Sequence, residues 1–121
     1  MKTFISALCL AALLIACGGP ATPSQTQLDA LAAVDNGAVF IDVRTPEEVA
    51  EGAFDDALKI PHEEILPRVK ALELDKNQPI ILYCRSGNRA GIAATALREA
   101  GFTNVTNAGG YEVLANARNQ T

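Results

Sequence analysis

The residues best suited to chemistry stand together in one short segment, Cys84-Arg85-Ser86-Gly87-Asn88-Arg89. A thiolate is a strong nucleophile, and neighbouring arginines favour the thiolate over the thiol. Gly87 would let a loop curl until its backbone N–H groups converge on one point, and such a loop binds small anions. The segment therefore predicts a nucleophilic Cys84 that acts on an anionic substrate. The alternative is a structural cysteine in an ordinary turn, because free cysteine is among the most often buried residue types.

The patterns on either side of Cys84 predict a strand before it and a helix after it. Residues 80–83 are a continuous apolar run, typical of a buried strand, and residues 90–100 are an alanine-rich helix that ends at Gly101. Open α/β sheets bind ligands at the carboxyl ends of their strands, and helix N-termini favour anions. We therefore expect residues 84–89 to form a loop at that edge.

Helical and strand patterns alternate along the rest of the chain, which predicts an α/β fold: a small, mostly parallel β-sheet with helices on both faces. Thr26 with Asp29 is expected to cap the first helix. Thr45 with Glu48 is expected to cap the second, with Pro46 at its first position. The expected strands are 38–43, 58–60, 80–83 and 105–106, and the expected helices are 26–36, one from 46, 63–72 with a break or kink at Pro67, 90–100 and 111–117.

Other polar residues are assigned supporting roles. Asp42 and Arg44 follow a buried strand, and we expect them to orient the nucleophile's loop or to pair and hold the neighbouring turn. Glu47 and Glu48 are accounted for by helix capping and the helix dipole, so no chemistry is assigned to them. His62 is expected to be solvated.

The N-terminal residues have the composition of an export signal, residues 1–16, whose apolar run is too short to span a bilayer. Leu14-Ile15-Ala16-Cys17 resembles a bacterial lipobox. We therefore expect cleavage before Cys17, its lipidation, and anchoring to a bacterial membrane facing the periplasm or another extracytoplasmic space. Residues 17–25 are rich in Gly, Pro and Ser and would form a flexible tether. The alternatives are an ordinary signal peptide and a buried N-terminal helix.

Length and charge limit the remaining possibilities. The 121 residues leave room for one folded domain, predicted at 26–121. A net charge of −4 argues against a nucleic-acid partner. Once Cys9 has left with the signal and Cys17 carries lipid, Cys84 is the lone thiol, so cysteine spacing predicts neither a disulfide nor a zinc site. We expect no metal, no cofactor and a monomer.

Four blocks of the chain, in order, resemble the single-domain rhodanese family, especially its small exported members. The family's active-site loop, Cys-Arg-x-Gly-x-Arg, is matched by residues 84–89. The other matching blocks are Phe40-Ile41-Asp42-Val43-Arg44 with Pro46-Glu47-Glu48, Ala57-Leu58-Lys59-Ile60-Pro61, and Val105-Thr106-Asn107-Ala108-Gly109-Gly110. Where many members have Gly-His-Ile, this chain has Gly52-Ala53-Phe54. We expect that change to affect packing or substrate access and to leave the nucleophile in place.

The resemblance implies a sulfurtransferase. Cys84 would take the sulfane sulfur of thiosulfate or a similar donor as a persulfide, and pass it to a thiophilic acceptor such as a thiol or a protein. The residues that would bind the donor are Arg85, Ser86, Gly87, Asn88 and Arg89. Two alternatives on the same fold stay open: a non-catalytic sulfur-carrier or redox or interaction module, and a phosphatase or arsenate reductase. Loop length disfavours the latter, since four residues separate Cys84 from Arg89 and phosphatases of this fold have one more.

Overall fold

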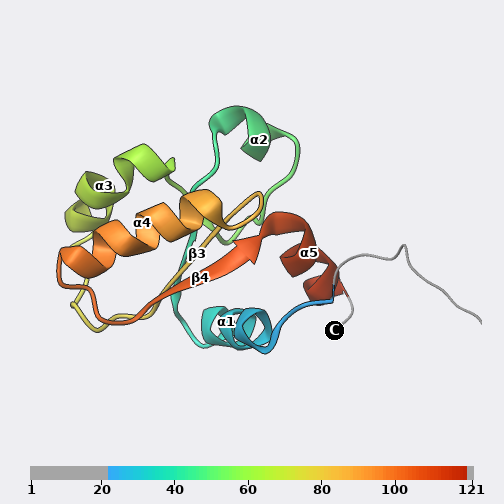
Figure 1. Cartoon of the computed structure of the whole chain (residues 1–121), viewed down its shortest axis with the longest axis horizontal. Helices are drawn as coiled ribbons and strands as arrows, with labels where there is room; N and C mark the ends of the chain where they lie inside the picture. Colours follow the sequence, from blue (N-terminus) through green and yellow to red (C-terminus); the bar gives the residue numbers. More distant parts are fainter. Residues whose placement is uncertain (1–21, 120–121) are drawn as a thin grey trace, which may run out of the picture.

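The computed structural model describes residues 22–119, in which helices and strands alternate (Figure 1). The elements are α1 (Gln25–Asp35), β1 (Val39–Asp42), α2 (Pro46–Ala50), β2 (Leu58–Lys59), the 3-10 helix η1 (His62–Glu64), α3 (Ile65–Ala71), β3 (Ile80–Cys84), α4 (Asn88–Glu99), β4 (Val105–Gly110) and α5 (Tyr111–Asn119). The predicted signal (1–16), the predicted lipidation site Cys17 and residues 18–21 of the predicted tether lie outside the described residues.

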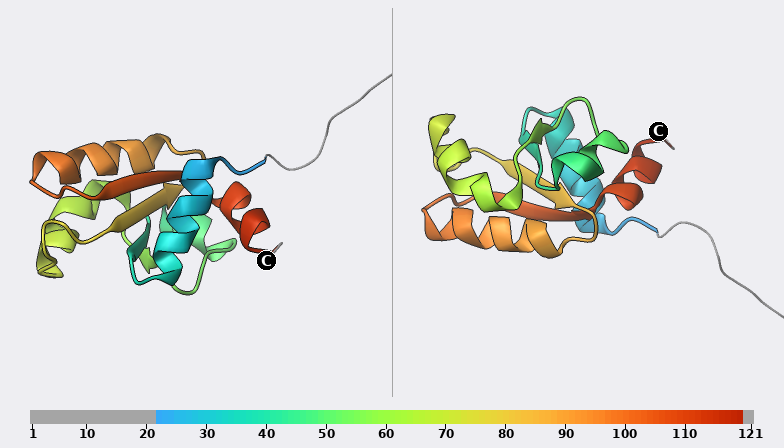
Figure 2. Two further views of the ribbon diagram at one scale, coloured as in Figure 1. Left: turned by 90° about the horizontal axis from the view of Figure 1, so that it is seen from below. Right: turned by 90° about the horizontal axis from the view of Figure 1, so that it is seen from above.

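The strands form one parallel sheet in the order β2-β1-β3-β4. Side chains alternate between its two faces, as the geometry of a strand requires. Ile41 and Leu82 pack with residues of α3 and α4, whereas Phe40 and Ile81 pack with residues of α1 and α5. Helices therefore cover both faces (Figure 2), which confirms the predicted α/β architecture.

The start of α2 follows its predicted cap. The Glu48 backbone N–H donates to Thr45 Oγ1 at 3.2 Å, and the Thr45 N–H donates to Glu48 Oε1 at 3.1 Å. Pro46 occupies the first helical position, where its missing N–H costs no hydrogen bond. The sequence therefore predicted this helix start in detail.

The cap of α1 lies earlier than predicted. Ser24 takes this role in place of Thr26 with Asp29, and Gln27 closes the capping box by accepting from the Ser24 N–H. Ser24 with Gln27 has the same three-residue spacing and satisfies two backbone donors at once. The helix consequently begins at Gln25, within the predicted tether.

The segments around Gly87 are more regular than predicted. β3 continues through Cys84, α4 begins at Asn88, and β4 extends through Gly110 where a loop was expected. The extension of β4 depends on pairing with β3, with a register shift between Leu82 and Cys84. Such pairing comes from the tertiary fold, and Asn-Ala-Gly-Gly has no strand preference that would indicate it.

Pro67 does not break a helix. It lies in the first turn of α3, where its missing N–H would have no helical partner. The expected interruption is instead the change from η1 to α3 between Glu64 and Ile65.

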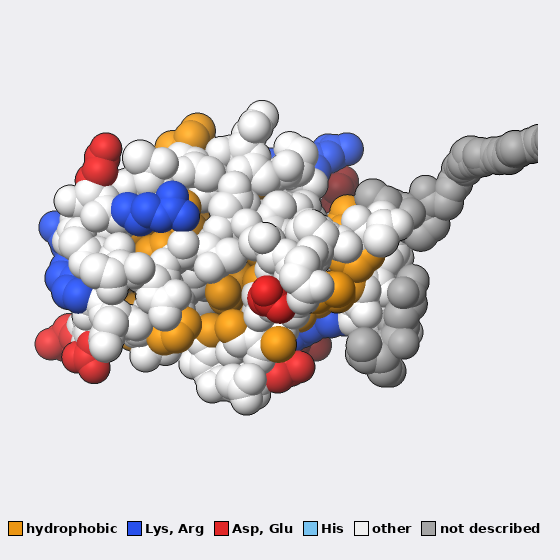
Figure 3. All heavy atoms as spheres, turned by 60° about the horizontal axis from the view of Figure 1, so that its bottom comes forward, with side chains coloured by type: hydrophobic (Ala, Val, Ile, Leu, Met, Phe, Trp, Pro, Cys, Tyr) orange, Lys and Arg blue, Asp and Glu red, His pale blue; other side chains and the backbone are white. Residues whose placement is uncertain are grey.

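The face formed by α1 and α5 carries apolar side chains at the surface (Figure 3). A pocket of about 480 Å³ there is lined by Leu28, Leu31, Ala32, Asp35, Ala117 and Arg118. Cys84 packs on the opposite face of the sheet, so this pocket is separate from the predicted active site. No helix among the described residues is long and apolar enough to cross a membrane.

Candidate active site

Strand β3 carries Cys84 to the carboxyl edge of the sheet. Every residue of β3 is buried, and Cys84, its last residue, is only 1% exposed. Its Sγ accepts hydrogen bonds from the backbone N–H groups of Gly87, at 2.9 Å, and Ala90, at 3.4 Å. Because N–H donors favour a charged acceptor, this arrangement suits a sulfur that carries negative charge.

The loop after Cys84 folds back against the end of β4. Gly87 has φ +102°, a left-handed conformation that glycine adopts readily. A Cβ on Gly110 would lie 2.5 Å from the Arg85 carbonyl oxygen, so only glycine fits there. Within residues 22–119, the N–H groups of Ser86, Asn88 and Arg89 have no hydrogen-bond acceptor. Free N–H groups at a helix N-terminus form a site for an anion.

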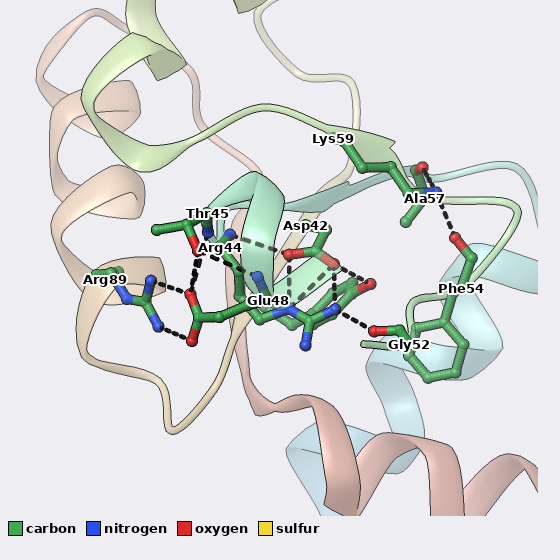
Figure 4. Close-up of polar contacts among 10 residues, drawn as sticks. Asp42, Arg44, Thr45, Glu48, Gly52, Phe54, Ala57, Lys59 and Arg89 are labelled. Atoms are coloured by element: carbon green, nitrogen blue, oxygen red, sulfur yellow. Dashed lines mark hydrogen bonds and ion pairs between the residues drawn. The ribbon is translucent and has the colours of Figure 1, made fainter. Parts of the chain in front are cut away.

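Arg89 forms an ion pair with Glu48, a residue to which the sequence analysis assigned no chemistry. Its guanidinium donates two hydrogen bonds to Glu48, of 2.6 and 2.9 Å, and joins α4 to α2 (Figure 4). The hydrogen bonds from Arg89 and the Thr45 backbone lower the pKa of Glu48 from 4.5 to about 2. The same pairing raises the pKa of Arg89. Sequence reasoning missed this pair because Glu48 is fully accounted for by its local cap.

Asp42 and Arg44 form a buried ion pair at the end of β1. Arg44 contacts both carboxylate oxygens of Asp42, the shortest contact being 2.8 Å, and also donates to the Gly52 carbonyl at 2.7 Å (Figure 4). The Tyr83 hydroxyl donates to Asp42 Oδ2 at 2.8 Å. Hydrogen bonding to Asp42 raises the pKa of Arg44, and burial raises that of Tyr83. The pairing expected from the sequence is present, and it lies beside the residue that precedes Cys84.

A cleft of about 300 Å³ opens beside the loop. It is lined by Arg44, Glu48, Glu51, Gly52, Arg85, Tyr111 and Glu112. Arg85, Glu51 and Glu112 are exposed, and none of them forms an ion pair among the described residues. Tyr111 is partly buried. The charged side chains of the cleft that have no ion pair among the described residues are therefore the guanidinium of Arg85 and the carboxylates of Glu51 and Glu112.

Of the predicted donor-binding residues, Gly87 contacts the Cys84 sulfur through its N–H, and Arg85 lines the cleft beside the loop. Arg85, Ser86 and Asn88 are exposed, whereas Arg89 is partly buried and ion-paired. His62 lies outside this group: its side chain is 25% exposed and Nδ1 lies 3.2 Å from Glu63. No cluster of three or more potential metal ligands occurs within residues 22–119.

At the departure from the family pattern, Gly52-Ala53-Phe54, the aromatic side chain packs against other rings. Phe54 stacks on Phe40 and also contacts the rings of Tyr83 and Tyr111, so it belongs to the core on the α1–α5 face. Asp56, in the following turn, accepts two hydrogen bonds from Arg118 of α5. These residues therefore serve packing at the end of the sheet.

Known proteins share this fold and are similar to this chain in sequence. Residues 24–117 match the family model described as Rhodanese-like domain. The chain is similar to the thiosulfate sulfurtransferase PspE of Escherichia coli K12, with 38% identity over 76 residues, which cover 63% of this chain and 73% of that protein. It is 36% identical over 69 residues to a sulfurtransferase of Allochromatium vinosum. The matched region covers 57% of this chain and 63% of the A. vinosum protein, which is just under two thirds of its length. A solved structure of a rhodanese with anions from E. coli superposes with a TM-score of 0.61 and 37% identity, over 65% of this chain and 93% of that chain.

Proposed function

The chain belongs to the rhodanese-like family, and on that basis we propose that it is a sulfurtransferase working through a persulfide on Cys84. The observation that carries the proposal is the environment of the Cys84 sulfur. Two backbone N–H groups donate to it, and it lies at the start of α4 beside further N–H groups that have no acceptor in the part of the chain that the structure describes. This environment stabilises negative charge both on a thiolate and on the terminal sulfur of a persulfide.

The reaction proceeds in two displacements. The Cys84 thiolate attacks the outer sulfur of thiosulfate, the sulfur–sulfur bond of the donor breaks, and sulfite leaves with the bonding electron pair. The enzyme then holds the transferred sulfur as an anionic persulfide. In the second step a thiophilic acceptor attacks the terminal sulfur, and the Cys84 thiolate is the leaving group.

Donor binding follows from the charges around the loop. Arg85 is exposed and faces the cleft, so it is free to attract a dianion such as thiosulfate. The N–H groups of Ser86, Asn88 and Arg89 supply hydrogen-bond donors, and Gly87 gives the loop its curvature. Since Glu48 already neutralises Arg89, this arginine contributes mainly by fixing the position of α4. A related E. coli rhodanese structure contains anions, which supports an anionic donor.

Replacing the nucleophile tests the proposal. Cys84→Ser should abolish the production of thiocyanate from thiosulfate and cyanide, because a serine hydroxyl is a far weaker nucleophile at neutral pH. The midpoint of thermal unfolding should change little, since serine is close in size to cysteine. Retained turnover in a folded Cys84→Ser protein would rule out Cys84 as the nucleophile.

A non-catalytic sulfur carrier or redox module would use the same Cys84 thiol, which is 1% exposed. The two functions differ in turnover. An enzyme releases many equivalents of thiocyanate per protein, whereas a carrier releases one equivalent of bound sulfur and then stops.

We also propose that the protein is exported and anchored to a membrane through a lipid on Cys17. The leader pattern of residues 1–16 and the lipobox-like residues 14–17 support this proposal. Cells grown with a clickable palmitate should label the wild-type protein and leave Cys17→Ala unlabelled. An unlabelled wild-type protein in the soluble periplasm would indicate an ordinary signal peptide.

A further inference from the structure

The side chain of Asn107 in β4 joins the nucleophile's loop to the sheet. Its Nδ2 donates to the Gly87 carbonyl oxygen at 2.9 Å, and its Oδ1 accepts from the Gly109 N–H at 2.9 Å. A single amide therefore connects Gly87 of the active-site loop to the end of β4. The same Gly87 oxygen also accepts the Gly91 N–H at 2.9 Å, so it is held from two directions.

The contact with Gly87 leads directly to the sulfur. Gly87 is the residue whose own N–H donates to Cys84 Sγ at 2.9 Å, and it is held in a left-handed conformation with φ +102°. A movement of Gly87 would therefore displace the shorter of the two hydrogen bonds to the sulfur. We propose that Asn107 is a positioning residue for Cys84, because it holds Gly87 where its N–H can stabilise the thiolate and the persulfide.

Two glycines lie beside the Asn107 amide, one in α4 and one in the loop. Gly91 lies inside α4, where glycine is a poor helix former, and a Cβ there would come within 3.4 Å of Asn107 Nδ2. A Cβ on Gly87 would lie 3.8 Å from Asn107 Oδ1 and 3.4 Å from the Gly109 Cα. The helix and the loop thus both lack side chains at the positions that the Asn107 amide approaches.

Two variants separate the two hydrogen bonds of Asn107. Asn107→Asp keeps an oxygen that can accept from the Gly109 N–H but loses the donor to Gly87, and Asn107→Leu loses both without adding charge. Asn104, an exposed residue just before β4, provides the matched controls Asn104→Asp and Asn104→Leu. The readout is the rate of Cys84 alkylation by iodoacetamide as a function of pH, followed in the full chain by mass spectrometry of the peptide that contains Cys84.

We expect both Asn107 variants to move the midpoint of the alkylation profile to higher pH, while both Asn104 variants match the wild type. In the sulfur-transfer assay, kcat should fall on the order of tenfold with little change in KM for thiosulfate, since a small displacement at a reacting atom slows the chemical step. A wild-type profile in Asn107→Asp, or in folded Asn107→Leu, would overturn the inference.

If Asn107→Leu does not fold, Asn107→Asp decides the question, because it keeps the acceptor for the Gly109 N–H and removes only the donor to Gly87.

The inference rests on the proposed function, but alkylation of a thiol requires no sulfur transfer. A wild-type protein that transfers no sulfur would therefore refute the proposed function, and the alkylation profiles would still decide the role of Asn107.

Discussion

Glu48 of α2 and Arg89 of α4 are joined by two hydrogen bonds although they stand 41 positions apart in the chain. Glu48 also caps its own helix through Thr45, so one carboxylate stabilises the turn after β1 and the helix that follows the Cys84 loop. Both partners are partly buried, with side chains 20% and 26% exposed. The pair therefore fixes the distance between two elements that border the active site.

Removing the charge of Glu48 should give a pH-dependent loss of stability. The folded state lowers the pKa of Glu48 from 4.5 to about 2, so its stabilising effect is complete above pH 4.5 and is lost as the pH falls towards 2. Glu48→Gln should therefore be less stable by about 1 kcal/mol at pH 7 and equal to the wild type near pH 2. Urea unfolding at both pH values measures this, with the exposed Glu47→Gln as the control. An equal deficit at both pH values would contradict the assignment.

The hydrogen bond from Tyr83 to Asp42 should be measurable by removing one hydroxyl. Tyr83→Phe removes one of the hydrogen bonds to the buried, charged Asp42 carboxylate, which should cost about 1–3 kcal/mol in the free energy of unfolding. Tyr111→Phe is the matched control, because the Tyr111 hydroxyl has no hydrogen bond within the described residues. Chemical denaturation of the two variants gives the comparison. Equal stability of the two would show that the Tyr83 hydroxyl contributes nothing.

The carboxylates of the cleft should slow the approach of an anionic donor. Glu51→Gln and Glu112→Gln each remove one unpaired negative charge beside Arg85, so kcat/KM for thiosulfate should rise about two- to threefold at low ionic strength. The gain should disappear at high salt, where such charges are screened. Glu99→Gln, at the far end of α4, should leave kcat/KM unchanged. A gain that is independent of salt would show that electrostatic repulsion is not its cause.

The features predicted most accurately from the sequence are local ones. The capping box at Thr45, the buried strand over residues 80–83 and the helix that follows the Cys84 loop all depend on residues close together in the chain. The features that were missed depend on the tertiary fold. The pair between Glu48 and Arg89 joins distant elements, and Asn107 lies in a strand that exists only because β3 pairs with it.

The same distinction explains the boundaries. Both Ser24 and Thr26 are suitable helix caps, and local patterns gave no reason to prefer the earlier one. The burial of Cys84 could not be predicted from local patterns either, because the polar residues that follow it suggested an open loop. In the structure the loop folds back against Gly110, and Cys84 is buried.

The central claim is that Cys84 carries the transferred sulfur. Purified protein would be treated with thiosulfate, freed of excess donor and digested, and the peptide that contains Cys84 would be weighed by mass spectrometry before and after cyanide. We predict a gain of one sulfur atom on that peptide, its complete removal by cyanide as thiocyanate, and no gain in Cys84→Ser. A Cys84 peptide of unchanged mass in an active preparation, or the same gain in Cys84→Ser, would contradict the account.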